Sequence, residues 1–416
     1  MTLVKTSVLT AVSTIIKVFT AFVINKVISI YIGPSGLALI GQLQDFNSII
    51  MNFATGAINN GVVKYTAEYK DNMSEKGKIF STALIITVVS SIIVALGLYL
   101  FDKNLSILIL KTDRYANIFS IFGFTIILFA LNTLFMSILN GQKEIKKFIL
   151  INIISSLLSL VLTSFLIIQY SLEGALMALV LNQSIVFFVT VFFITKSNWF
   201  AIKYFLQGID KISLIKLGKY SLMALTSIIM VPASYLIIRN YIGEHLGWNN
   251  AGYWQGIWYI SSMYLMVITT SLGVYYLPKL SEIKDKKKLK FEIISGYKII
   301  MPLVIVIAFS IYLFREYVIY FAFTNKFLPM LELFKWQLIG DVIKIASWLL
   351  SYLMIAKAMT KIFIVSEIAF SSSFVLLSIL LIQQFGLIGV TYAFTINYSM
   401  YFLFTIIYFR KVIYEQ

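Results

Sequence analysis

Charged side chains inside apolar segments are the residues of this sequence that could do chemistry. Lys17 and Lys26 precede Asp45 in two consecutive apolar runs, and Asp341 and Lys344 share a third. A charge at the centre of a bilayer costs roughly 2.5–3.5 kcal/mol on insertion scales, so such groups normally face a bundle interior or a watery cavity. Lysines in such a place suit a multivalent anion, because electrostatic attraction is stronger where the dielectric constant is low.

The carboxylates among these residues have two open interpretations. Asp341 and Lys344 are three residues apart, share one helix face and can pair. They form either a self-neutralising pair or a cavity-lining cation tempered by a carboxylate. Asp45 lies at a depth similar to that of Lys17, as the rise of 1.5 Å per residue indicates. Glu367, near the start of its apolar run, is either a protonatable site or an interfacial side chain. We expect Asp45, Asp341 and Glu367 to balance the charge of the lysines or to bind and release a coupling ion.

Four further basic residues are candidate cavity cations beside Lys17 and Lys344. Lys26 lies nearer the outer surface, where a lysine can extend its ammonium group to the headgroups. Arg239 stands at the outer end of an apolar run, and Lys64 and Lys219 flank the inner ends of two others. A positive-inside bias explains Lys64 and Lys219 equally well.

Trp254 and Trp258 are the aromatic candidates. They are four residues apart and share a helix face. One interpretation is that they stack on sugar rings. The other is an aromatic belt at the membrane interface, where tryptophan is enriched.

The composition excludes several classes of protein. Of the 416 residues 60% are hydrophobic and 12% are charged, and the mean hydropathy is +0.89, which indicates a polytopic membrane protein. The chain has no cysteine and only one histidine, so we predict no thiolate or multi-histidine metal site and no cofactor. There is no phosphate-binding glycine loop, no nucleophile elbow and no loop long enough for a catalytic domain. We therefore predict that the protein is not an enzyme.

The hydropathy pattern predicts an all-α protein with twelve transmembrane helices. Each apolar run is long enough to cross a bilayer, which needs about 20 residues. The predicted spans are 6–32, 36–63, 79–101, 116–140, 148–169, 172–195, 213–240, 250–277, 291–314, 328–356, 361–383 and 387–409.

The basic residues predict the orientation of these spans. Of the 34 lysines and arginines, 23 fall in the loops on the side of the amino terminus and only 6 in the loops on the opposite side. The positive-inside rule then places both termini in the cytoplasm. The net charge of +16 thus follows from topology and does not indicate nucleic-acid binding. No cleavable signal peptide is evident, so we expect the first span to be retained.

The longest cytoplasmic connection, about 196–212, divides the spans six and six. We predict an N-lobe at 1–200, a cytoplasmic linker at 201–212 and a C-lobe at 213–416. The halves echo each other, because 57–71 and 271–285 both end a span and enter a charged loop. Both halves begin and end inside, so they are parallel repeats, a design that places the substrate path between them.

Several segments resemble the enterobacterial Wzx flippases. The first is the amino-terminal run with Lys5, Ser13-Thr14, Lys17 and Lys26, followed by Gly33-Pro34-Ser35-Gly36. The others are Asn60-Gly61-Val62-Val63-Lys64-Tyr65, Trp336-Gln337-Leu338-Ile339-Gly340-Asp341-Val342-Ile343-Lys344, Ala356-Lys357-Ala358 and Ser366-Glu367. The similarity covers nearly the whole chain, and the block 336–344 is its most specific part.

The resemblance implies a fold and a transport function. It implies the fold of the multidrug/oligosaccharidyl-lipid/polysaccharide (MOP) exporter superfamily, with two six-helix lobes and a cationic central cavity. The implied function is the alternating-access transfer of undecaprenyl-diphosphate-linked O-antigen units across the bacterial inner membrane. A polysaccharide polymerase and a chain-length regulator are candidate partners beside the membrane lipids.

Two alternatives within the superfamily stay open. The first is a flippase for lipid III, the precursor of enterobacterial common antigen. In that branch we expect a basic residue where this chain has Gln44, so the departure favours an O-antigen unit. The second is a small-molecule exporter of the multidrug (MATE) type, whose preference for cations would require a cavity dominated by carboxylates. A polysaccharide polymerase would need a large external loop, and a passive structural subunit would not need charges inside its spans.

Overall fold

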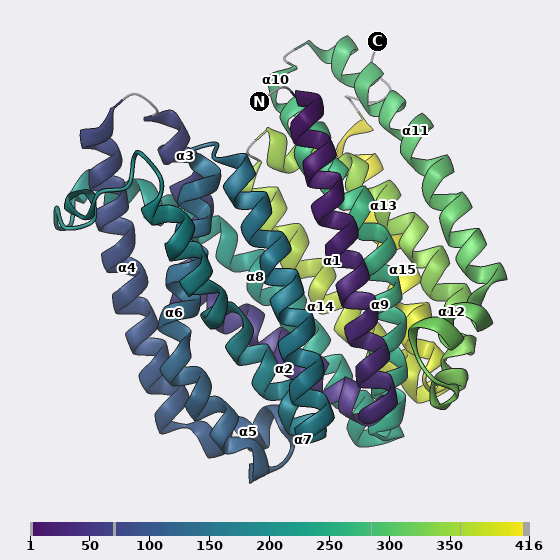
Figure 1. The fold of residues 1–416 in the computed structure, drawn as a ribbon. Helices are drawn as coiled ribbons and strands as arrows, with labels where there is room; N and C mark the ends of the chain where they lie inside the picture. The colour runs from purple at the N-terminus through teal and green to yellow at the C-terminus, as the bar shows by residue number, and fades with distance from the viewer. Residues whose placement is uncertain (1–2, 70–71, 284, 358, 411–416) are drawn as a thin grey trace. The chain divides into compact units, whose positions relative to one another are not determined.

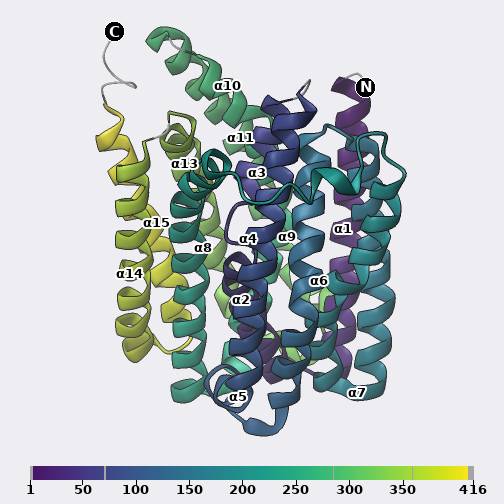
Figure 2. The same cartoon turned by 90° about the vertical axis from the view of Figure 1, so that its left-hand side faces the viewer.

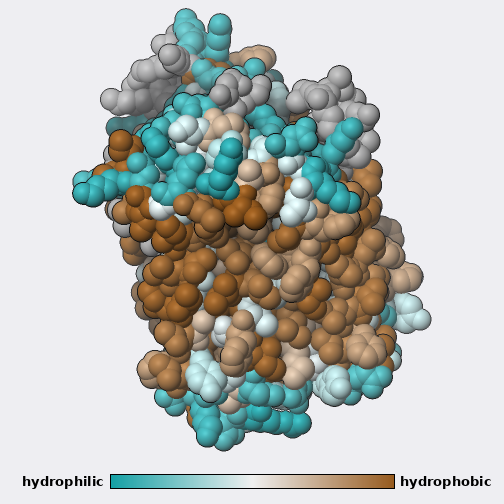
Figure 3. Space-filling view, turned by 60° about the vertical axis from the view of Figure 1, so that its left-hand side comes forward, coloured by the Kyte–Doolittle hydropathy of each residue, from teal (hydrophilic) through white to brown (hydrophobic). Residues whose placement is uncertain are grey.

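The computed structural model describes residues 3–69, 72–283, 285–357 and 359–410, and all regular secondary structure in these ranges is helical (Figure 1). The chain divides into two compact units. Unit 1 comprises Met1–Ile32 and Leu39–Ala233, and unit 2 comprises Gly33–Ala38 and Ser234–Gln416. Figure 3 shows a wide band of hydrophobic residues bounded at each end by hydrophilic ones. This is the surface expected of a protein that spans a bilayer.

Unit 1 is a bundle of helices with short connections. Its elements are α1 (Leu3–Tyr31), α2 (Pro34–Ala54) from Leu39 onward, α3 (Asn59–Glu68), α4 (Met73–Leu100), α5 (Asp102–Leu110), η1 (Asp113–Tyr115), α6 (Ala116–Gly141), α7 (Ile145–Thr195), η2 (Ile202–Tyr204) and the part of α8 (Lys211–Leu246) that ends at Ala233. Helix α6 packs against both α4 and α7, and α7 also packs against α1 (Figure 2).

Unit 2 is built around α13. Its elements are the remainder of α8, α9 (Trp248–Ser271), the π-helix η3 (Leu272–Tyr276), α10 (Leu277–Glu282), α11 (Lys286–Leu313), α12 (Arg315–Ala322), the 3-10 helix η4 (Asn325–Leu333), α13 (Phe334–Ala356), α14 (Thr360–Phe385) and α15 (Ile388–Tyr408). Helix α13 packs against α11 and α15, and α15 packs against α14. Buried apolar side chains of α9, α11 and α13 form a common core.

The structure has helix within each of the twelve predicted spans. In the described ranges, eight helices are long and apolar enough to cross a membrane, and α7 is one of them. Helix α7 contains two spans, because its backbone breaks at Ser171 (φ 50°, ψ −126°). Asn182 then donates hydrogen bonds to Ser159 (3.0 Å) and Thr163 (3.1 Å), so the two halves run antiparallel. Helices α2, α8 and α9 have at least 21 residues each and complete the predicted set.

The predicted span 36–63 differs from the structure, because it is two helices. Helix α2 ends at Ala54 and α3 begins at Asn59. Between them, Gly56 (φ 64°) and Ala57 (φ 53°) adopt left-handed conformations that end a helix. A Cβ on Gly56 would lie 2.6 Å from a methyl group of Ile86, so only glycine fits there.

The turn at Gly33–Ala38 belongs to unit 2 although the helices around it belong to unit 1. Gly252 of α9 packs directly on this turn. A Cβ at that position would lie 1.9 Å from the carbonyl oxygen of Pro34. The absence of a side chain at Gly252 therefore permits the close approach.

The connection from α7 to α8 packs against α4. Ser81 donates a hydrogen bond to the carbonyl oxygen of Gly208 (2.8 Å), and the amide of Asp210 donates to Thr82 (3.0 Å). Phe205 stacks on Phe80 with ring centroids 5.5 Å apart. The connection is therefore held within unit 1 by hydrogen bonds and an aromatic contact.

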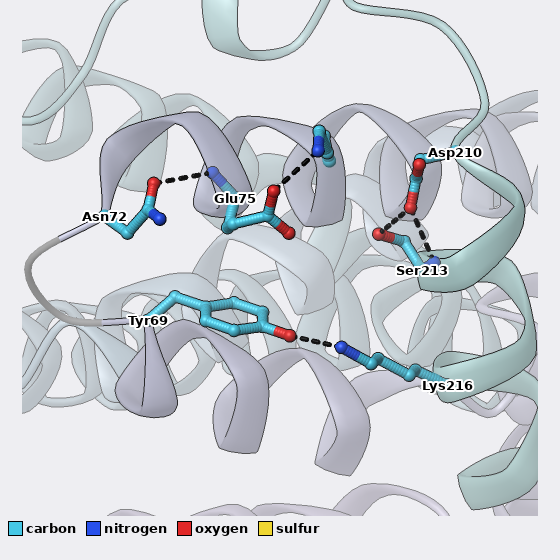
Figure 4. Close-up of polar contacts among 7 residues, drawn as sticks. Tyr69, Asn72, Glu75, Asp210, Ser213 and Lys216 are labelled. Carbon is cyan, nitrogen blue, oxygen red and sulfur yellow. Dashed lines mark hydrogen bonds and ion pairs between the residues drawn. The ribbon is translucent and has the colours of Figure 1, made fainter.

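Figure 4 shows how the helices at this end of unit 1 are capped. Asn72 accepts a hydrogen bond from the amide of Glu75 and caps α4 (3.1 Å). Asp210 accepts from both the amide and the hydroxyl of Ser213 (2.8 and 2.7 Å) and caps α8. These two bonds favour the ionised carboxylate and lower the pKa of Asp210 below its ordinary value. Lys216 donates to the hydroxyl of Tyr69.

The connections of unit 1 alternate between its two ends as predicted. The end of α3, the start of α4 and the connection to α8 lie together, whereas α5 lies at the opposite end (Figures 1 and 2). The lysine-bearing segments 64–69, 72–78 and 196–211 are thus at one end. Which end faces the cytoplasm stays a prediction.

Candidate functional site

Asp341 is the most buried of the predicted charged residues, with no exposed surface. Its carboxylate accepts hydrogen bonds from Ser261 (2.6 Å) and Tyr264 (2.9 Å) of α9. Gln337, one turn earlier on α13, donates a third (3.3 Å). These donors compensate much of the cost of burying an anion, and they fix its position against α9.

Lys344 lies one turn after Asp341, and its half-buried ammonium group is surrounded by aromatic rings. The nitrogen is 4.9 Å from the ring centroid of Trp348, 5.5 Å from that of Tyr398 and 5.8 Å from that of Phe394. Ring faces attract cations at such distances. Asp341 and Lys344 act on each other electrostatically. Of the two interpretations, the direct ion pair is not found between these two described side chains, because the Asp341 carboxylate accepts hydrogen bonds from α9 and the Lys344 ammonium group lies among aromatic rings.

Arg239 of α8 is a second cation of unit 2 and is buried, with 2% of its surface exposed. Its guanidinium lies 5.6 Å from the ring centroid of Trp254. Tyr235, one turn earlier, contacts both Trp254 (5.7 Å) and Trp258 (5.4 Å). The structure thus brings three predicted site residues together. An interfacial belt does not describe Trp254, which is 2% exposed and lies within unit 2.

Tyr398 of α15 connects these groups. Asp341, Glu367 and Tyr235 act on Tyr398 electrostatically, and its ring centroid lies 5.5 Å from the nitrogen of Lys344. Glu367 of α14 is half-buried and also acts on Tyr401. The interior of unit 2 therefore combines two cations, two carboxylates and several aromatic rings. The two cations of this set can bind an anionic group, and the two carboxylates can bind and release a proton or another cation.

The predicted residues of unit 1 are not brought together in the same way. Lys17 is exposed on α1, and its ammonium group contacts no carboxylate in the described part of the chain. Lys26 and Asp45 are half-buried, and each takes part in a polar interaction. Lys64 is exposed on α3, with its nitrogen 5.1 Å from the ring centroid of Tyr65. The side chain of Lys219 lies outside the described residues. The roles of these residues stay predictions.

Sequence reasoning missed the neutral groups that hold the charged ones. Ser261 and Tyr264 lie 80 and 77 residues from Asp341, and no sequence pattern announces these contacts. Gln337 and Trp348 were accessible, because each lies four residues from the charge that it contacts. Within the described ranges, His, Asp and Glu form no group of three that could hold a metal ion.

Comparison with known proteins identifies the family. The model of the family described as "Polysaccharide biosynthesis protein" matches residues 3–284. The chain is also 30% identical over 408 residues to the lipid III flippases of Escherichia coli K12 and Shigella flexneri, and the match covers 97% of either chain. The protein belongs to this family of polysaccharide biosynthesis proteins. The predicted relationship to Wzx-type flippases of the MOP superfamily is therefore confirmed.

Solved structures confirm the fold. An inward-facing multidrug resistance MATE family transporter of the MOP superfamily has a TM-score of 0.79 at 14% identity, with 96% of this chain and 98% of that chain covered. A MOP superfamily transporter from Pyrococcus furiosus has a TM-score of 0.70 at 14% identity, with 98% and 96% covered. The family member described here thus has the all-α MOP-exporter fold, as predicted.

Proposed function

We propose that this protein is a flippase that moves a lipid-linked oligosaccharide across a membrane. The proposal is supported by family membership and by near full-length similarity to lipid III flippases. The predicted orientation, with both termini in the cytoplasm of a bacterial cell and the substrate leaving toward the periplasm, is part of this proposal. Alternating access is the expected mechanism.

The observation that carries the proposal is the presence of two cations, buried Arg239 and half-buried Lys344, in the interior of unit 2. A lipid diphosphate is a compact anion that must leave water to cross a membrane. Arg239 and Lys344 are held among aromatic rings, where they replace water around such an anion more strongly than exposed cations do. The same feature distinguishes the protein from an exporter of cationic drugs, whose cavity would require carboxylates in excess.

The aromatic rings and Asp341 have separate roles in this proposal. The rings of Trp348, Tyr398 and Phe394 position the ammonium group of Lys344 without neutralising it, so that it stays available to phosphate oxygens. Asp341 provides a fixed negative charge one turn away, which stabilises the cation when no substrate is bound. Substrate then competes with weak aromatic contacts and not with a direct ion pair.

The substrate is an oligosaccharide linked to undecaprenyl diphosphate. We infer that its sugars form an O-antigen unit, because Gln44 stands where the lipid III branch is expected to have a basic residue. Lipid III is the alternative, because the chain is 30% identical to lipid III flippases. A polysaccharide polymerase and a chain-length regulator are the proposed partners that receive the product.

The carboxylates Asp45, Asp341 and Glu367 are proposed to couple the return of the empty transporter to an ion gradient. Outward movement of an anion is favoured by an inside-negative potential, by about 2.3 kcal/mol per charge and 100 mV. The empty protein must then return its cations. A proton or another cation taken up outside and released inside by one of these carboxylates would drive that step.

A reconstituted system tests the proposed function. Purified protein in liposomes is supplied with fluorescent undecaprenyl-diphosphate-linked oligosaccharide, and a membrane-impermeant quencher reports the fraction in the outer leaflet. We expect protein-dependent equilibration between leaflets that is lost when Arg239→Gln and Lys344→Met are combined. Exposed Lys103→Met in the same liposomes is the matched control. Equal rates in protein-free liposomes and in those with the protein would refute the proposed function.

A further inference from the structure

Unit 1 contains a cavity of about 440 Å³ that is lined by uncharged polar groups. Six lining residues carry amide side chains: Gln44, Asn47, Asn52, Asn59, Asn182 and Gln183. Four others carry hydroxyl groups, three are apolar, and none of the lining residues is charged. The volume is in the range of roughly 300–1,000 Å³ that small-ligand sites occupy.

The two backbone breaks of unit 1 create this cavity. The break between α2 and α3 places Thr55 and Asn59 on one wall. The reversal at Ser171 brings the second half of α7 back, so that Asn182 faces the same space as Ser159. Helix α6 closes it with Phe129 and Thr133. The helical segments on either side of the two breaks therefore contribute residues to one cavity.

Some of the amides are held in fixed orientations. Asn182 donates to Ser159 and Thr163 (3.0 and 3.1 Å). The amide oxygen of Gln183 accepts from Asn132 (3.0 Å), and Asn132 accepts in turn from Thr190 (2.6 Å). A chain of hydrogen bonds that begins outside the cavity thus orients a lining side chain. Such an arrangement is preorganised for a ligand.

Two amide oxygens of the cavity have no partner. The Oδ1 atoms of Asn47 and Asn59 are buried and accept no hydrogen bond in the described part of the chain. Asn47 as a whole is only 8% exposed. Buried acceptors of this kind are uncommon and call for a donor from a ligand or from ordered water. They accept from O–H and N–H groups, whereas a phosphate offers only acceptors to them.

We propose that this cavity binds the sugars of the lipid-linked oligosaccharide. Sugar hydroxyl groups both donate and accept hydrogen bonds, as amides do, and they carry no charge. The absence of lysine, arginine and carboxylate from the lining disfavours a phosphate or a metal cation. This inference rests on the proposed function and adds a second site to it, a site for the sugars within unit 1.

A binding measurement with two lipids tests the proposal. The probes are undecaprenyl diphosphate and the undecaprenyl-diphosphate-linked oligosaccharide purified from the cell's own membranes, each titrated into the full protein in nanodiscs. We expect wild-type protein to bind the glycosylated lipid at least tenfold more tightly. Asn47→Leu should reduce this ratio at least fivefold and leave the Kd for undecaprenyl diphosphate within twofold.

Thermal stability separates a ligand role of Asn47 from a structural one. The Oδ1 atom of Asn47 has no partner within the described residues, so Asn47→Leu should leave the melting temperature unchanged or raise it. Asn152→Leu is the matched control. Asn152 lies on α7 of the same unit, but its side chain donates to the carbonyl oxygen of Phe148 (2.8 Å) and does not line the cavity. This control should leave the ratio of the two affinities unchanged.

The outcomes distinguish this inference from the proposed function. The cavity proposal would be overturned if wild-type protein bound both lipids with equal affinity, or if Asn47→Leu left the ratio of the two affinities unchanged. If undecaprenyl diphosphate still bound and Lys344→Met weakened that binding, the proposed function would stand. Failure of wild-type protein to bind either lipid would overturn both.

Discussion

Replacement of Asp341 tests the interior of unit 2. In Asp341→Ala three buried donors, from Ser261, Tyr264 and Gln337, lose their acceptor. Each buried donor left unsatisfied costs about 1–3 kcal/mol, and hydroxyl rotation relieves part of the sum. We expect the free energy of unfolding of Asp341→Ala to be about 3–5 kcal/mol lower than that of wild-type protein, as when one member of a buried polar set is removed.

Asp341→Asn separates charge from shape. The amide oxygen can still accept from Ser261 and Tyr264, and the amide of Gln337 can turn to accept from the new nitrogen. The hydrogen bonds from the hydroxyl groups of Ser261 and Tyr264 then go to a neutral acceptor and no longer to a charged one, which costs about 2 kcal/mol. This cost is offset because burying a neutral amide costs less than burying a carboxylate. Asp341→Asn should therefore be markedly more stable than Asp341→Ala.

The assay is a melting curve of each purified variant, followed by flipping in liposomes with an imposed pH gradient. Exposed Asp113→Asn is the matched control and should match the wild type in both measurements. If Asp341 is the coupling group, Asp341→Asn should flip substrate without responding to the gradient. A melting temperature of Asp341→Ala equal to that of wild-type protein would refute the reasoning, because it would show that the three donors do not depend on this carboxylate.

Four further predictions follow from the topology, the cap and the predicted site. Reporters fused after Lys146 and Asp210 should signal cytoplasm and a reporter after Glu244 should signal periplasm; a periplasmic signal at Asp210 would contradict the six-plus-six division. The cap of α8 stabilises the fold fully above pH 3.8, the ordinary pKa of its carboxyl group, and loses this effect as the pH falls through the lowered pKa of Asp210. The melting-temperature gap between wild type and Asp210→Ala should thus narrow only in acid, and a constant gap would contradict the cap. Lys17→Ala should impair surface polysaccharide assembly at normal protein levels, and full complementation would exclude a role in binding. If the flipping rate of Asp341→Asn still depends on the pH gradient, then that of Glu367→Gln should not. Flipping rates of both variants with and without the gradient will show which carboxylate is responsible.

The helices of this protein were predictable, because long apolar runs have few alternatives to membrane-spanning helices. The break between α2 and α3 was harder to predict. It depends on the left-handed conformation of Ala57, which is a non-glycine residue. The segment Gly33–Ala38 belongs to unit 2, where it contacts Gly252, more than 200 residues later in the chain. Local sequence patterns carry no information about such contacts.

The charged residues of the candidate site could be predicted from the sequence, whereas the residues that contact them could not. Charges in apolar runs are costly, so Asp341, Lys344 and Asp45 were apparent from the sequence. Their spacing suggested a direct pair of Asp341 with Lys344, but α9 supplies Ser261 and Tyr264 to the carboxylate and aromatic rings surround the lysine. The amide-lined cavity of unit 1 was not apparent, because isolated asparagines in apolar helices have no pattern until two backbone breaks bring them together.

The central claim is that Arg239 and Lys344 bind the diphosphate of the substrate, and one affinity measurement tests it directly. Undecaprenyl diphosphate is titrated into nanodiscs with wild-type protein, with Lys344→Arg and with Lys344→Met. A charge-assisted hydrogen bond contributes about 1.5–3 kcal/mol, so Lys344→Met should weaken binding by roughly 10- to 150-fold. Lys344→Arg, which keeps the charge, should stay much closer to wild type. Equal affinity of wild-type protein and Lys344→Met for undecaprenyl diphosphate would contradict the account.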